Sequence, residues 1–152
     1  MNLLPGDALL YVGTGWFSRA IQVKTFSRFS HIEVFVGDEQ SVASRDGVGV
    51  GRYPLRTDDL RAVLRPHAAV DIAAALAWFE TVKGQPYDVM GLFNFFVARW
   101  RGQENGAMFC SEFATRFYRA GGFHPFSDST DADTVAPGEF AKSPVFDHVT
   151  VL

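Results

Sequence analysis

The sequence lacks several features that would assign it quickly to a class. Its 152 residues include a single cysteine, Cys110, so neither an internal disulfide nor a cysteine-rich zinc site can form. The net charge is −3 and no run of lysine or arginine stands out, which argues against nucleic acid as a partner. No apolar run reaches the ~18 residues that a membrane span needs. No signal peptide is visible, so a cytoplasmic start is expected.

The chain does contain enough apolar material for one core. Apolar residues make up 47% and charged residues 20%, which fits a single domain over residues 1–152. Alternating and helical patterns predict a block of strands, a block of helices and a closing strand, an order that favours the α+β class. We therefore expect a small antiparallel sheet packed against a helix cluster. The expected strands cover 8–12, 30–36, 41–44, 48–53, 61–64 and 146–152, the expected helices 16–24, 72–83, 88–99 and 110–119, and the polar loops 101–106 and 128–133.

Cys110 stands where a glycine-containing loop enters the predicted helix 110–119. The N-terminus of a helix carries partial positive charge and free N–H groups, which stabilise a thiolate and can hold a developing oxyanion. These properties make Cys110 a candidate nucleophile. The alternative is that Cys110 is simply the first core residue of an amphipathic helix, since Phe113, Ala114 and Phe117 continue the same apolar face.

His31 begins a predicted strand, and Glu33 follows on the same face of that strand. A carboxylate in this position can fix the tautomer that leaves the other ring nitrogen free for a thiol. His67 and His124 are expected in loops, and His148 is expected to be structural. A zinc site begun by His31 and Glu33 is a weaker alternative, because neither HExxH nor CxxC spacing is present. We expect no metal and no cofactor.

Five segments, taken in order, resemble the permuted branch of the NlpC/P60 papain-like superfamily, which includes YiiX/YaeF-like amidases. In unpermuted members the cysteine helix precedes the histidine strand, whereas here the histidine comes first. The matching segments are Leu4–Asp7, Phe29–Val34, Gly84–Asp88, Phe109–Phe113 and Val135–Phe146.

The resemblance implies a cysteine hydrolase that cleaves an amide bond through a thioester. Cys110 matches the nucleophile and His31 the base. Relatives place the third, orienting residue on the next strand, here near Ala43, which cannot serve. We therefore assign that role to Glu33, with Ser44 as second choice. Tyr87 and Ser111, which lie in two of the matching segments, and Ser44 are the expected substrate contacts.

The superfamily's commonest bacterial substrate, the peptide stem of peptidoglycan, makes a cell-wall endopeptidase or amidase the leading hypothesis. Without a signal peptide, such an enzyme would reach the periplasm or cell wall through a phage or a secretion machine. One alternative is a lipid acyltransferase or thioesterase, whose acyl groove would be lined by Phe93, Phe95, Phe96 and Trp100. The other is a catalytically silent binding module.

Overall fold

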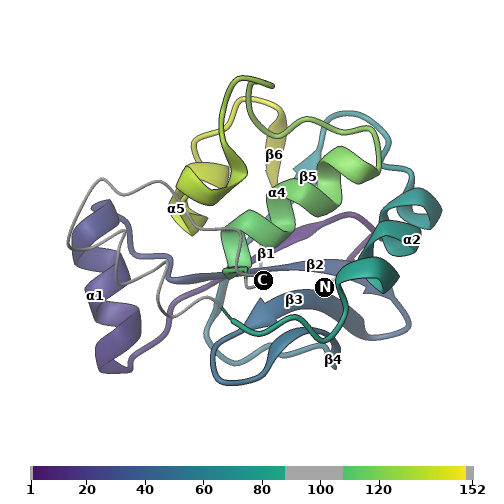
Figure 1. Cartoon of the computed structure of the whole chain (residues 1–152). Coiled ribbons are helices and arrows are strands. Elements are labelled where there is room, and N and C mark those ends of the chain that lie inside the picture. Colours follow the sequence, from purple (N-terminus) through teal and green to yellow (C-terminus); the bar gives the residue numbers. More distant parts are fainter. Residues whose placement is uncertain (1, 88–107, 150–152) are drawn as a thin grey trace.

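The computed structural model describes residues 2–87 and 108–149, and its centre is one antiparallel sheet in the order β4-β3-β2-β1-β5-β6 (Figure 1). This confirms the predicted α+β class. The strands are β1 (Ala8–Tyr11), β2 (His31–Gly37), β3 (Gln40–Arg45), β4 (Gly49–Pro54), β5 (Leu60–Pro66) and β6 (Phe146–Val149). The helices are α1 (Trp16–Thr25), α2 (Ile72–Val82), α4 (Cys110–Ala120), the 3-10 turn η1 (Ala132–Thr134) and α5 (Pro137–Phe140).

The strand β2 separates its side chains between the two faces of the sheet, as its alternating pattern predicts. Ile32 and Val34 enter the large core beneath the helices, whereas Phe35 joins a smaller apolar cluster on the opposite face. Glu33 lies on the Phe35 side, directly opposite Leu9 of β1. The strand β2, which begins at His31, therefore contributes side chains to both faces of the sheet.

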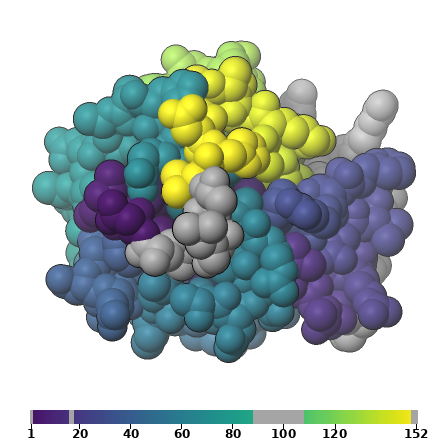
Figure 2. All heavy atoms as spheres, turned by 180° about the vertical axis from the view of Figure 1, so that it is seen from behind, coloured from purple at the N-terminus to yellow at the C-terminus, as the bar shows by residue number. Residues whose placement is uncertain are grey.

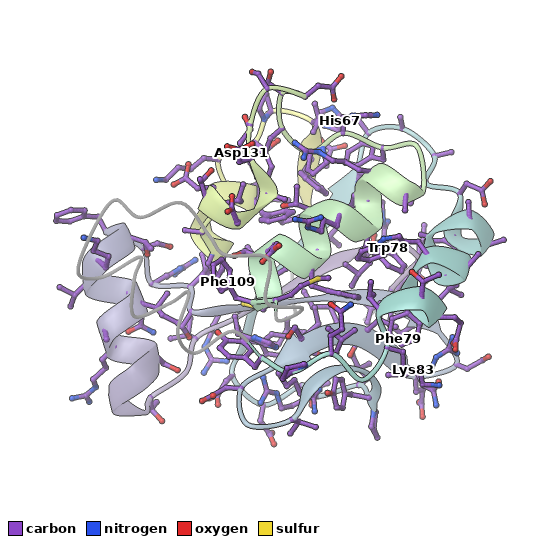
Figure 3. All side chains as sticks on the ribbon, viewed as in Figure 1. His67, Trp78, Phe79, Lys83, Phe109 and Asp131 are labelled. Carbon is purple, nitrogen blue, oxygen red and sulfur yellow. The ribbon has the colours of Figure 1, made fainter. Side chains whose placement is uncertain are left out.

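The helix α4 lies across one face of the sheet and packs against β2, β3, α2 and η1 (Figure 1). Most of its side chains are buried, and Phe113 contacts the rings of Trp78 and Phe79. Figure 3 labels these two partner residues on α2. At its far end the Tyr118 hydroxyl donates to the carbonyl of Gly6, at 2.8 Å. This packing fixes where the first residue of α4 lies.

Local signals account for several of the helix ends. Asp71 caps α2 by accepting a hydrogen bond from the Ala74 N–H at 2.9 Å, as its position before the helix predicts. Gly121 ends α4 and comes so close to Val70 that a Cβ would clash at 2.7 Å. The predicted helix 88–99, the loop 101–106 and the aromatic residues Phe93, Phe95, Phe96 and Trp100 lie outside the described residues. Within the described ranges, no helix combines the length and apolarity required to cross a bilayer.

Candidate functional site

Cys110 is the first residue of α4, and its side chain is almost completely buried. The preceding residue, Phe109, occupies the N-cap position and has no side-chain acceptor for the first N–H groups of the helix. The first N–H groups of any α-helix have no partner within the helix. The sulfur therefore lies at the positive end of α4, beside backbone donors suited to an oxyanion.

Two hydrogen bonds hold the segment that leads into α4. The Ser44 hydroxyl donates to the carbonyl of Met108 at 2.6 Å, and the Met108 N–H donates to the carbonyl of Pro86 at 3.1 Å. Ser44 is fully buried on the helix-covered side. This placement supports neither of the roles expected for Ser44, because its hydroxyl is engaged with the backbone and has no exposed surface to offer a substrate. Ser44 instead anchors the entry to the cysteine helix.

His31 begins β2 at the end of the sheet where α4 starts, and its side chain is 17% exposed. The structure brings it together with Cys110, whose thiol is within hydrogen-bonding reach of the imidazole. The ring nitrogen Nε2 lies 3.1 Å from Oε1 of Glu33. With Nε2 occupied by the carboxylate, Nδ1 is the ring nitrogen left for the thiol.

The environment of His31 favours its charged form. Burial alone would lower the pKa of the imidazole, but the charge and hydrogen bond of Cys110, together with those of Glu33, raise it to about 9. This direction is the one expected for an imidazole held by an ionised carboxylate. The site is therefore arranged to stabilise a histidine imidazolium beside the side chain of Cys110.

Glu33 is a fully buried carboxylate with an unusually complete set of donors. Arg45 donates from Nε to Oε1 at 2.9 Å and from Nη2 to Oε2 at 3.1 Å, and the Ser41 hydroxyl also donates to Oε2. Burial alone would raise the pKa of Glu33, but the hydrogen bonds from His31, Arg45 and Ser41 lower it to about 2. Glu33 is thus held ionised and in one orientation.

The arginines around Glu33 were not predicted from the sequence. Arg45 lies over the ring of Tyr53 at 4.1 Å, and Arg56 lies over the ring of Tyr11 at 4.5 Å, with its Nη2 4.0 Å from the Glu33 carboxylate. Stacking on an aromatic ring restricts a guanidinium while leaving its edge free to donate. Residues 41 and 45 share the face of Glu33 by strand alternation, which is the signal that would have found them.

A pocket opens beside Cys110, between the start of α4, the side of α1 and the segment from 135 to 137. Its lining is almost entirely apolar and includes Ile21 and Pro137. Tyr87, one of the expected substrate contacts, also borders it. Ser111 also borders it, but its hydroxyl is buried and donates to the Val135 carbonyl at 2.5 Å, so this side chain fastens α4 to the neighbouring segment.

The remaining histidines lie away from this site. His67 pairs with Asp147 at 2.9 Å, His124 pairs with Asp128 four residues later, and Nε2 of His148 is 3.0 Å from the carbonyl of Ala141. Across residues 2–87 and 108–149, no group of three or more histidine, cysteine, aspartate or glutamate side chains is arranged to hold a metal ion.

The fold resembles that of a solved bacterial protein. The crystal structure described as the metalloprotein yiiX from Escherichia coli O157:H7, DUF1105, superposes with a TM-score of 0.71, and the match covers 96% of each chain. Sequence identity is 16%, so this likeness concerns the fold alone. No protein-family model and no curated protein sequence matches the chain. The described residues offer no metal-binding group of the kind that the word metalloprotein would imply.

Proposed function

We propose that this protein is a cysteine hydrolase in which Cys110 is the nucleophile, His31 the acid–base group and Glu33 the orienting residue. One observation carries the proposal: the chain's only thiol, at a helix N-terminus, contacts an imidazole that is itself held by a buried, ionised carboxylate. A nucleophile, a base and a group that orients the base form the minimum set for acyl transfer. The order of His31 before Cys110 further supports assignment to the permuted papain-like branch.

In the first half-reaction the Cys110 thiolate attacks the carbonyl carbon of an amide. The carbonyl oxygen becomes an oxyanion, which the first N–H groups of α4 stabilise. The carbon–nitrogen bond then breaks, the His31 imidazolium transfers its proton to the departing amine, and the acyl group stays on sulfur as a thioester.

In the second half-reaction neutral His31 removes a proton from water, and the resulting hydroxide attacks the thioester carbon. The carbon–sulfur bond breaks, the carboxylic acid leaves and the thiolate–imidazolium pair is restored. Glu33 takes part in neither bond change. It keeps the Nε2 side of the ring fixed so that Nδ1 faces the sulfur in both steps.

The dyad can be tested by alkylation with iodoacetamide, which reports on one site because Cys110 is the only cysteine. We expect the wild-type protein to react at pH 7 clearly faster than a free-thiol peptide, and the His31→Ala variant to react at the rate of that peptide. A wild-type rate no faster than the peptide, unchanged in His31→Ala, would show that Cys110 is a packing residue. The protein would then be better described as a binding module.

For the substrate we propose the peptide stem of peptidoglycan, with cleavage by an endopeptidase or amidase. Digestion of purified muropeptides, followed by mass spectrometry, should reveal new amine and carboxyl ends with wild-type protein and none with Cys110→Ser. Failure to cleave any stem peptide, in a preparation whose Cys110 is reactive towards iodoacetamide, would reject this substrate while retaining the dyad.

The apolar lining of the pocket favours a second candidate, a thioesterase or acyltransferase acting on lipid-derived acyl groups. The walls of this pocket include Ile21, Val135 and Pro137, which suit an alkyl chain better than a charged peptide. Turnover of acyl thioesters without peptide cleavage would select this alternative.

A further inference from the structure

The outer side of α1 exposes large apolar side chains. Phe26, which follows the last residue of the helix, is 95% exposed, and Val23 is 74% exposed. Arg19, Val23 and Phe26 are separated by four and three residues, so they lie along one side of the helix. Figure 1 shows α1 at the margin of the molecule, beyond the end of the sheet, and Figure 2 shows that this segment forms one flank of the surface.

The segment that carries these apolar side chains is positively charged in a protein that is negative overall. From residue 8 to residue 32 the sequence contains no aspartate or glutamate, although the whole chain has a net charge of −3. Three cations occur in this stretch, Arg19, Lys24 and Arg28, and all three are exposed. We call these three cations, with Val23 and Phe26, the α1 surface.

Phe26 has a backbone conformation that phenylalanine seldom adopts. Its φ is 50°, in the left-handed region, where glycine or asparagine usually ends a helix. The helix end is satisfied through the Phe26 backbone N–H, which donates to carbonyls of the last turn, so that the aromatic ring is not needed for capping. A ring that is 95% exposed also adds nothing to the core. Folding therefore gives no reason for an aromatic residue at this position.

We propose that the α1 surface docks on an anionic lipid surface. Phe26 and Val23 would enter the boundary between headgroups and acyl chains, while Arg19, Lys24 and Arg28 remain among the anionic headgroups. The charge favours this occupant, because basic residues beside exposed apolar ones match a negatively charged interface. The opposite side of α1 lines the pocket beside Cys110 through Ile21, so docking would place that pocket close to the lipid.

Sedimentation of the full-length protein with vesicles tests this proposal, independently of any catalytic activity. We expect binding to vesicles containing phosphatidylglycerol, much weaker binding to pure phosphatidylcholine, and a decrease with added salt. Phe26→Asn removes the aromatic ring and introduces a residue that tolerates the left-handed region. It should weaken binding about tenfold. Lys24→Gln combined with Arg28→Gln should weaken binding about 25-fold, at about fivefold for each charge.

The matched control is Val48→Asn, which removes another exposed apolar side chain, 69% exposed, from the turn between β3 and β4. It should leave vesicle binding unchanged. Thermal melting of every variant shows whether it is folded, and Phe26→Asn is expected to melt no lower than wild type. Equal binding to neutral and anionic vesicles, or equal losses in Val48→Asn and Phe26→Asn, would overturn the proposal. So would Phe26-dependent self-association without lipid, or retention on a soluble polyanion with no vesicle binding.

Discussion

On the helix-covered face of the sheet, Cys110 is surrounded by apolar side chains, whereas on the opposite face His31 is held through a carboxylate and its arginine partners. Apolar packing is non-directional, and it places the start of α4 by filling space. Charge-assisted hydrogen bonds are directional, and they fix the angle of a ring. The comparison shows that Cys110 is positioned by apolar packing and His31 by charged hydrogen bonds, so the two can be disturbed separately.

The largest effect on stability is expected from the packing side. Phe113→Ala removes a ring that contacts Trp78, Phe79 and Phe117 at centroid distances of 5.6 to 6.2 Å, and should lower the free energy of unfolding by about 3–5 kcal/mol. Urea unfolding measures this loss, with Phe26→Ala as the exposed control that should cost almost nothing. Alkylation of the folded fraction should stay within about twofold of wild type. A tenfold loss would show that packing also sets the geometry of the dyad.

On the charged side, Glu33→Gln keeps the shape of the side chain and removes its charge. The pKa of His31 should fall, because Glu33 is one of the groups that raise it, and the alkylation rate of Cys110 at pH 7 should fall about tenfold or more. Stability should drop by about 1–3 kcal/mol, since Arg45, itself partly exposed, loses its buried partner.

Together with the two single variants, the double variant Glu33→Gln with Arg45→Gln forms a mutant cycle. The cycle measures the interaction energy between the two side chains. Titration of the His31 ring by NMR gives the pKa directly. An unchanged pKa in Glu33→Gln would contradict the orienting role of Glu33.

The pH dependence of stability follows from the same two groups. The pKa of His31 is raised from 6.5 to about 9. Its contribution to the free energy of unfolding is therefore complete below about pH 6.5 and is lost as the pH rises through 9. The pKa of Glu33 is lowered from 4.5 to about 2, so its contribution is complete above about pH 4.5 and is lost as the pH falls through 2.

The melting temperature, measured across this range, should therefore have its plateau between about pH 4.5 and 6.5 as far as this pair is concerned. Cys110→Ala removes the main group that raises the pKa of His31, and should move the alkaline decline to lower pH. A decline at the same pH in wild type and Cys110→Ala would assign it to other groups.

The smallest effects on stability and on pKa values are expected from two buried serines, one on each face of the sheet. Ser44→Ala leaves the Met108 carbonyl without its donor and should cost about 1 kcal/mol, with the pKa of His31 unchanged. Ser41→Ala removes a donor to Glu33 and should raise the pKa of that carboxyl. NMR titration and urea unfolding distinguish the two. If Ser44→Ala shifted the His31 titration, the two faces would not be independent.

The sequence predicted the elements whose signals are local. Strand alternation placed β2, and the side chain of Asp71 marked the start of α2, because both depend on near neighbours. The approach of His31 to Cys110 came only from the resemblance, since no local rule joins residues so far apart. Ser44, the second choice for the orienting residue, shares the face of Val42 by alternation, beneath the helices, and not that of Glu33.

Arg45 was missed for a different reason. Strand alternation places Arg45 on the face of Glu33, but alternation alone does not show which residues of β3 lie near a given residue of β2. A long guanidinium also reaches diagonally across a sheet, so its partner need not be the residue directly opposite. Side chains that support a site from the neighbouring strand are therefore the part of this structure that pattern analysis recovers least.

The hydrogen bond from Tyr118 to Gly6 joins groups 112 positions apart along the chain. It ties the end of the cysteine helix to the turn before β1, the strand that lies between β2 and β5 in the sheet. During synthesis that turn leaves the ribosome long before its partner is made. The helix that carries Cys110 can therefore be locked in place only after residue 118 has emerged, and until then the thiol remains apart from its final surroundings.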